Sequence, residues 1–249
     1  MVLSMINYFY ASGDSFAFGQ EMGESFQRNL YDFTFHHRKH CYTGIMCDSL
    51  KSVLRYRNKA LPGGSNERVY RKLICNLSED LLKFKPENMF VTISLTHAHR
   101  REFYMNSSKN WYPHMYTYSP KKEDEVVYNL WEMLVQEVSD DKGINMFDVM
   151  QILGIQNFLI KNKIPYLLTT SMGTPEENAL LEKSVPKQVL NQIYKPRFYN
   201  ELSFSSFTSI NGYSRGPGWH PLEDAHRAWA NHLLEHINQN DLFSNEDLL

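Results

Sequence analysis

Ser15 and His220 are the two side chains of this 249-residue chain whose types and surroundings favour hydrolytic chemistry. Ser15 closes a Gly-Asp-Ser turn after an apolar run at residues 5–11, so its hydroxyl and backbone N–H are expected to be exposed at a strand-to-helix turn. His220 lies in a glycine-rich loop just before the last helical stretch, where an imidazole can act as a general base. Together they predict attack by a serine hydroxyl on a carbonyl carbon.

A glycine turn after the second β-like run offers hydrogen-bond donors for the negative charge that such an attack creates. The residues Ala60-Leu-Pro-Gly-Gly-Ser-Asn66 follow the run at 53–60. Their N–H groups are expected to point outward at the same end of the sheet as Ser15, next to the Asn66 amide.

The alternative interpretation of Ser15 is that it is an ordinary helix N-cap and has no catalytic role.

The order of apolar runs and helical stretches predicts a parallel sheet with helices on both faces. Strand-like runs lie at residues 5–11, 53–60, 89–96 and 164–170. Helical periodicity covers residues 67–83, 123–138, 144–161 and 223–237. Such alternation is typical of βαβ units. We therefore expect one α/β domain over residues 1–240, with loop insertions near 29–42, 101–120 and 199–219 and a flexible tail at 241–249.

In their order along the chain, these blocks resemble the SGNH (GDSL-like) hydrolase superfamily. The blocks are Gly-Asp-Ser at 13–15, Gly-Gly-Ser-Asn at 63–66, and His-Pro at 220–221 followed by Ala-His-Arg-Ala-Trp-Ala at 225–230. GGSN with ERVYRKL, and SLTHAHRREFY, look most like a divergent phage or bacterial branch. The resemblance implies a three-layer α/β/α sandwich with a mainly parallel five-stranded sheet. It also implies ester hydrolysis, commonly removal of acyl groups from carbohydrates or lipids, without a cofactor.

Carried over by position, the resemblance makes Ser15 the nucleophile and His220 the base. The first oxyanion donor is then the N–H of Ser15, and the second is the N–H of Gly64, with Gly63 as the alternative.

The third block departs from the family pattern. The family normally presents an Asn after the third strand, whereas this turn reads Leu95-Thr96-His97-Ala98-His99. The Thr96 hydroxyl or the Asn66 amide would then complete the oxyanion hole.

The residue three positions before His220 also departs from the pattern, because Pro217 stands where the family carries an Asp that holds the imidazole tautomer. A backbone carbonyl or a carboxylate from elsewhere then orients the ring, or the enzyme works as a dyad. Loss of the Asp from a triad costs about 10⁴-fold in turnover. Glu223 stands three before His226 and imitates the motif, but an i, i+3 pair within a helix is more simply a packing or surface contact.

The substrate pocket is expected to include Asp14, His97, Arg100 and Trp219, which flank the three blocks. The chain contains 15 Tyr, 15 Phe and 4 Trp, and much of this aromatic surplus falls in the last two insertions. These rings are expected to border Ser15 and to offer stacking faces for sugars, with core packing as the alternative. They are Phe103, Tyr104, Trp111, Tyr112, Tyr116, Tyr118, Tyr199, Phe204, Phe207, Tyr213 and Trp219.

Charge and composition exclude several other classes of protein. The formal charge of −2 argues against a nucleic-acid partner. The cysteines Cys41, Cys47 and Cys75 lack zinc-like spacing, and the histidines at 36–40 are interpreted as a solvated basic loop, so no metal site is expected. The sequence shows no secretion signal and no apolar stretch of membrane-spanning length, so the expected location is the cytoplasm, or the virion if the protein is phage-encoded.

The sequence therefore predicts a serine esterase that acts on an O-acylated carbohydrate through a Ser-His dyad or an incomplete triad. Its partner would be a small-molecule or glycan ester. The alternative is a weakly active or inactive protein of the same fold, structural or glycan-binding, for example a virion component. The missing Asp and the altered third block favour this alternative.

Overall fold

The centre of the molecule is a parallel sheet with the strand order β2-β1-β3-β6. The structure is a computed structural model and describes residues 6–22, 40–106, 109–115, 125, 128–129, 131–133, 141–173 and 183–248. The strands of this sheet are β1 (Tyr8–Ser12), β2 (Arg55–Asn58), β3 (Met89–Leu95) and β6 (Tyr166–Thr170). An isolated parallel bridge between Leu168 and Phe198 continues the sheet beyond β6. Within the described residues, the expected fifth strand is thus reduced to a bridge, whereas the α/β fold is confirmed.

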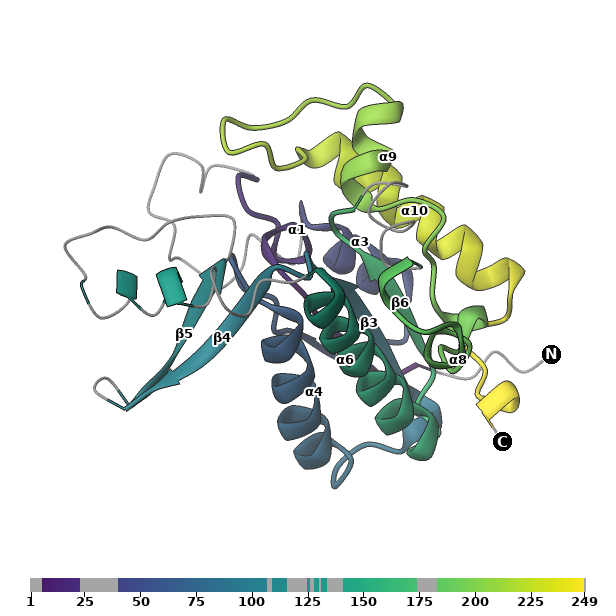
Figure 1. The fold of residues 1–249 in the computed structure, drawn as a ribbon. Coiled ribbons are helices and arrows are strands. Elements are labelled where there is room, and N and C mark those ends of the chain that lie inside the picture. Colours follow the sequence, from purple (N-terminus) through teal and green to yellow (C-terminus); the bar gives the residue numbers. More distant parts are fainter. Residues whose placement is uncertain are drawn as a thin grey trace.

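Helices cover both faces of this sheet (Figure 1). On one face α4 (Asn66–Asp80) packs beside α6 (Asp141–Lys161), and on the other α3 (Tyr42–Ser49) packs beside α10 (Glu223–Gln239). The shorter helices and turns are α1 (Ser15–Phe18), η2 (Pro86–Asn88), α8 (Lys187–Leu190), η3 (Lys195–Arg197), α9 (Phe204–Ile210) and η4 (Glu246–Leu248). Among the described residues, no helix is both long enough and apolar enough to cross a membrane.

β1 shows why the strands appear in the sequence as continuous apolar runs. Tyr8 and Tyr10 belong to the core under α4 and α6, whereas Phe9 and Ala11 belong to the core under α3 and α10. Successive side chains of a strand point to opposite faces, so a strand covered on both sides buries every residue. Burying one large apolar side chain contributes about 1.5–3 kcal/mol to stability.

The parallel register brings the candidate site residues to one edge of the sheet. Ser12 pairs with Ile93, and Leu95 pairs with Thr170, so the residues that follow β1, β3 and β6 lie together. Gly13 makes the turn from β1 into α1 with a φ of 157°. A Cβ at this position would lie 2.8 Å from both Ala17 Cβ and the Ser94 carbonyl oxygen, so the turn requires glycine.

The insertion at 101–120 is not an irregular loop. β4 (Arg100–Met105) and β5 (Asn110–Met115) form an antiparallel hairpin that projects beyond α4 in Figure 1. Tyr104 and Trp111 pair across it with their rings 5.7 Å apart, and both are exposed. Residues 29–39 of the first insertion and most of the helix predicted at 123–138 lie outside the described residues.

Several aromatic residues of the third insertion pack in the core. Tyr199, Phe204 and Phe207 are buried, and the rings of all three lie within 6 Å of the Trp229 ring of α10. Core packing, the alternative considered for these rings, is therefore what the structure shows.

The C-terminal segment is not a flexible tail. Leu242, Phe243 and Leu248 are buried, and the fully buried Arg197 donates to the carbonyl oxygens of Leu242 at 2.8 Å and Ser244 at 2.5 Å. Arg197 also forms an ion pair with Asp247. The tail prediction was wrong because the charged residues that looked solvated include the partner of a buried arginine.

Candidate active site

Ser15 is the first residue of α1 and not its N-cap. Asp14 is the cap, because its Oδ1 accepts a hydrogen bond from the Phe16 N–H at 3.0 Å. Ser15 is buried, and neither its hydroxyl nor its N–H makes a hydrogen bond within the part of the chain that the structure describes. The N-cap alternative for Ser15 is thus wrong, and among the described residues neither group has an internal partner.

The His220 imidazole lies beside the first turn of α1. Its ring centroid is 5.4 Å from that of Phe16, the residue after Ser15. Only 14% of the His220 side chain is exposed. The candidate base thus contacts the residue that follows the candidate nucleophile, and no hydrogen bond joins His220 to Ser15 among the described residues. In unliganded enzymes such contacts often tighten only when substrate binds.

Glu21 occupies the place of the missing acid beside His220. Its Oε2 lies 3.2 Å from His220 Nδ1, within ion-pair distance, but the geometry is not aligned for a hydrogen bond from the ring. The same carboxylate accepts hydrogen bonds from the N–H of Gly218 at 2.6 Å and of His220 at 3.2 Å. Glu21 is therefore the candidate for a carboxylate from elsewhere, one of the options left by the sequence.

The loop 216–220 is shaped around the Glu21 carboxylate. A Cβ at Gly216 or Gly218 would overlap the Glu21 side chain, so only glycine allows this approach. Glu21 and Trp219 both have left-handed backbones, with φ of 69° and 67°. Such a conformation costs about 1–2 kcal/mol for a residue with a side chain, and residues held in it cluster at functional sites.

His226, the other candidate base, is a structural residue. It is fully buried in α10, and its Nδ1 accepts a hydrogen bond from the Tyr42 N–H at 3.0 Å. Burial lowers the pKa of His226 to about 3, so the ring is neutral and fixed as an acceptor. Glu223 does not contact it through the imitated motif; it pairs with His40 at 2.9 Å.

The glycine turn leaves a different donor available from the one that the resemblance assigns. The Gly64 N–H donates to the Leu61 carbonyl oxygen at 2.9 Å, and the Leu61 N–H donates to the Gly13 carbonyl oxygen at 3.1 Å. Gly64 is therefore engaged in holding the turn against Gly13. Across the described chain, the N–H of Gly63 has no such partner, and the space around Gly63 is open.

The Asn66 amide is fully used by internal hydrogen bonds. Its Nδ2 donates to the Thr96 carbonyl oxygen at 3.0 Å and to Asp148 Oδ1 at 2.5 Å, and its Oδ1 accepts from the Thr96 N–H at 2.8 Å. Both amide protons are thus taken. Asn66 ties α4 to the end of β3 and to α6, and in this conformation it is not a free oxyanion donor.

The Thr96 hydroxyl is not a free oxyanion donor either, because it donates to Asp14 Oδ2 at 2.8 Å. The same oxygen accepts from Ser171 Oγ at 2.8 Å and from the Arg100 guanidinium at 2.9 Å. Asp14 is completely buried, so it anchors these three side chains and does not line the pocket as expected. The Nε of Arg100 is buried without a hydrogen-bond partner.

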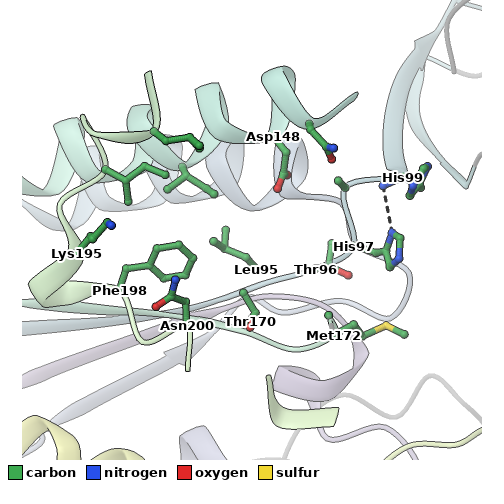
Figure 2. Close-up of a pocket in the computed structure, with 16 residues that line it drawn as sticks. Leu95, Thr96, His97, His99, Asp148, Thr170, Met172, Lys195, Phe198 and Asn200 are labelled. Atoms are coloured by element: carbon green, nitrogen blue, oxygen red, sulfur yellow. Dashed lines mark hydrogen bonds between the residues drawn. The ribbon is translucent and has the colours of Figure 1, made fainter. Parts of the chain in front are cut away.

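Two cavities flank this edge of the sheet. One of about 320 Å³ lies at the ends of β3 and β6 and is lined by His97 and Thr96 (Figure 2). The other, of about 730 Å³, includes Glu21 and residues 212–217. Trp219 lines neither and is 76% exposed beside His220. Among the described residues, no group of His, Cys, Asp or Glu side chains is arranged to hold a metal ion.

A family model matches most of the chain. Residues 28–247 match a family of unknown function (DUF6071), a match that begins after Ser15 and Glu21. No curated protein matches the chain in sequence.

Solved structures share the fold at low sequence identity. A structure described as "The active site of a carbohydrate esterase displays divergent catalytic and non-catalytic binding functions" has a TM-score of 0.53 and 14% identity, covering 95% of this chain and 66% of that one. TesA has a TM-score of 0.50 and 12% identity over 98% and 100% of the two chains. The psychrotrophic esterase EstA from Pseudoalteromonas sp. has 0.50 and 11% over 94% and 97%. These similarities show the fold of the SGNH hydrolases.

Proposed function

The chain belongs to the DUF6071 family, and from its SGNH fold and the geometry at His220 we propose that it is a serine esterase with a Ser15–His220–Glu21 triad. The observation that carries the proposal is the position of the Glu21 carboxylate, 3.2 Å from His220 Nδ1. The His220 imidazole itself packs against Phe16, the residue after Ser15. A carboxylate at Nδ1 fixes the tautomer in which Nε2 accepts a proton, and it stabilises the imidazolium that forms.

In the proposed reaction, the Ser15 hydroxyl attacks the ester carbonyl carbon while its proton passes to His220 Nε2. The N–H groups of Ser15 and Gly63 donate to the oxyanion. The intermediate collapses, and His220 returns the proton to the leaving alkoxide. Water then attacks the acyl-enzyme with His220 as the base, which releases the acid and restores Ser15.

An O-acylated carbohydrate is the substrate class that we propose. Trp219 supports it, because a largely exposed indole directly before the base offers a flat face to a sugar ring. The Trp219 carbonyl oxygen accepts a hydrogen bond from Arg215 at 2.8 Å, which fixes the backbone that presents the ring.

The experiment is turnover of p-nitrophenyl acetate and of acetylated xylo-oligosaccharides by the wild-type chain, Ser15→Ala and His220→Ala. Each variant is expected to lose at least 10³-fold in turnover, in keeping with removal of a triad member, whereas the control variants Ser49→Ala and His236→Ala keep wild-type rates. Equal turnover by wild type and Ser15→Ala would overturn the proposal.

A second candidate function is carbohydrate binding without catalysis. This function is favoured because the donor groups of Gly64, Asn66 and Thr96 already form internal hydrogen bonds. The same assay separates the two functions, since a binding protein would show no turnover that depends on Ser15.

A further inference from the structure

The cavity of about 320 Å³ is a separate space from the Ser15 turn. It lies on the α6 side of the sheet edge, between α6 and residues 190–200, whereas α1 and α10 cover the other face (Figures 1 and 2). Thr96 and Met172 form the wall toward the active site, because they line the cavity and also contact Asp14 and Arg100, respectively. Ser15 and His220 do not line it.

Two polar side chains of α6 reach this cavity without full partners. Asn145 and Asp148 are three positions apart, a spacing that places them on one face of a helix. Asn145 is only 8% exposed, yet its amide has no hydrogen-bond partner among the described residues. Asp148 accepts from Asn66 through Oδ1 alone. An amide and a carboxylate oxygen that line a cavity without protein partners can each form hydrogen bonds with a ligand, so this pair favours a ligand that carries polar groups.

The opposite side of the cavity is apolar. Figure 2 shows the Phe198 ring next to Asn200 and Leu95, across the cavity from Asp148. Ile193 also lines the cavity, and Ile152 adds an apolar side chain from α6 itself. The volume is at the low end of the range for ligand pockets, about 300–1,000 Å³, which suits a single ring.

We propose that this cavity binds one neutral sugar residue, with two hydroxyl groups on Asp148 and Asn145 and the C–H face of the ring on Phe198. A carboxylate beside a carboxamide accepts and donates at adjacent points, which matches neighbouring hydroxyls. A simple acyl chain would leave both groups unpaired. Lys195 and Asp148 line the same cavity with opposite charges, so the lining as a whole favours an uncharged ligand.

This inference deepens the proposed function, on which it rests for the substrate class, by giving the carbohydrate part of the ester a site of its own. Binding and hydrolysis are nevertheless measured separately. Titration of a Ser15→Ala chain isolates binding, so a failure of hydrolysis in the wild type and a failure of binding in this variant are different results.

The test is saturation-transfer NMR and calorimetric titration of the Ser15→Ala chain with methyl glycosides of xylose, glucose and galactose, and with octanoate. We expect one glycoside to bind and octanoate not to bind. Adding Asp148→Asn, Asn145→Ala or Phe198→Ala is expected to weaken that binding at least 10-fold. Asp148→Asn retains an acceptor for Asn66, and Asp224→Asn, in the other cavity, is the control that keeps wild-type affinity.

Three results would overturn the proposal. One is the absence of binding by every glycoside at 100 mM, on the order of ten times the weakest affinity of a useful site. Another is binding that Asp148→Asn and Asn145→Ala both leave unchanged. The third is binding of octanoate in place of the glycosides, which would assign the cavity to the acyl group.

Discussion

The two sides of the candidate active site are built in opposite ways. On the base side, the Glu21 carboxylate and the loop 216–220 hold His220 with a residue that the family pattern does not use. On the oxyanion side, Gly64, which the family pattern assigns as a donor, donates within its own turn, and Asn66 and Thr96, the candidates for the third donor, are joined to each other and to Asp148 and Asp14. The acid that orients the base can thus be supplied by a residue outside the family pattern, whereas a residue that matches the pattern, such as Gly64, can serve only to hold its turn.

The largest expected effect comes from the base side. Glu21→Gln keeps an oxygen that accepts from the Gly218 N–H but replaces Oε2, which accepts from the His220 N–H, by an NH2 group, and so removes the charge beside Nδ1. Because a comparable change in a triad lowers kcat by about 10⁴, we expect a loss of 10³–10⁴ in kcat for p-nitrophenyl acetate. Glu223→Gln, which removes a carboxylate that pairs with His40, is the matched control. A Glu21→Gln chain as active as the control would show that the base works as a dyad.

The next effect is on stability and comes from the oxyanion side. Asn66→Ala leaves the Thr96 N–H and carbonyl oxygen and one oxygen of Asp148 without their partner. We expect the free energy of unfolding to fall by about 3 kcal/mol in urea titrations, because buried polar groups are left unpaired. Asn240→Ala, at an exposed amide, should change it by less than about 0.5 kcal/mol. Equal effects of the two variants would contradict a structural role for Asn66.

The fold and the base side differ in how far the sequence predicts them. The strands and α4 with its Ser65 cap follow from apolar runs and turn residues, which are local signals. Glu21 does not follow, because its contact with His220 spans 199 residues and nothing near either residue encodes it. The hairpin was missed because Pro113 interrupts a run that otherwise suits a strand.

The oxyanion side shows a similar limit. Turn composition predicts donors at one edge of the sheet, but which proton is free depends on distances of tenths of an ångström between segments. The resemblance assigned Gly64 by position and left Asn66 and Thr96 as candidates for the third donor, and the structure shows that all three already donate elsewhere.

A smaller effect is the pH dependence of stability that comes from Asp148, the carboxylate that accepts a hydrogen bond from Asn66. Burial raises the pKa of Asp148 to about 6, above the value of about 3.9 for an unfolded chain. The folded state therefore binds this proton more tightly than the unfolded chain does. The contribution of Asp148 to the free energy of unfolding is complete below about pH 4 and is lost as the pH rises through 6. Asp148→Asn should thus gain on the order of 2 kcal/mol relative to wild type between pH 4 and 7, measured by urea unfolding. Asp224→Asn is the control, and a constant difference would contradict the raised pKa.

The smallest expected effect is that of Thr96→Val on turnover. The Thr96 hydroxyl donates to Asp14, so its removal should lower kcat less than about 10-fold, whereas loss of a true oxyanion donor costs about 10²–10³. Thr96→Ser, which retains the hydroxyl, is the matched control. A loss of 10² or more in Thr96→Val alone would return Thr96 to the oxyanion hole.

The most direct measurement is fluorophosphonate labelling followed by mass spectrometric mapping of the modified residue. We expect phosphonylation of Ser15, abolished in His220→Ala and slowed in Glu21→Gln, with the Glu223→Gln chain labelled as fast as wild type. No labelling, or labelling of a serine other than Ser15, would contradict the proposed triad.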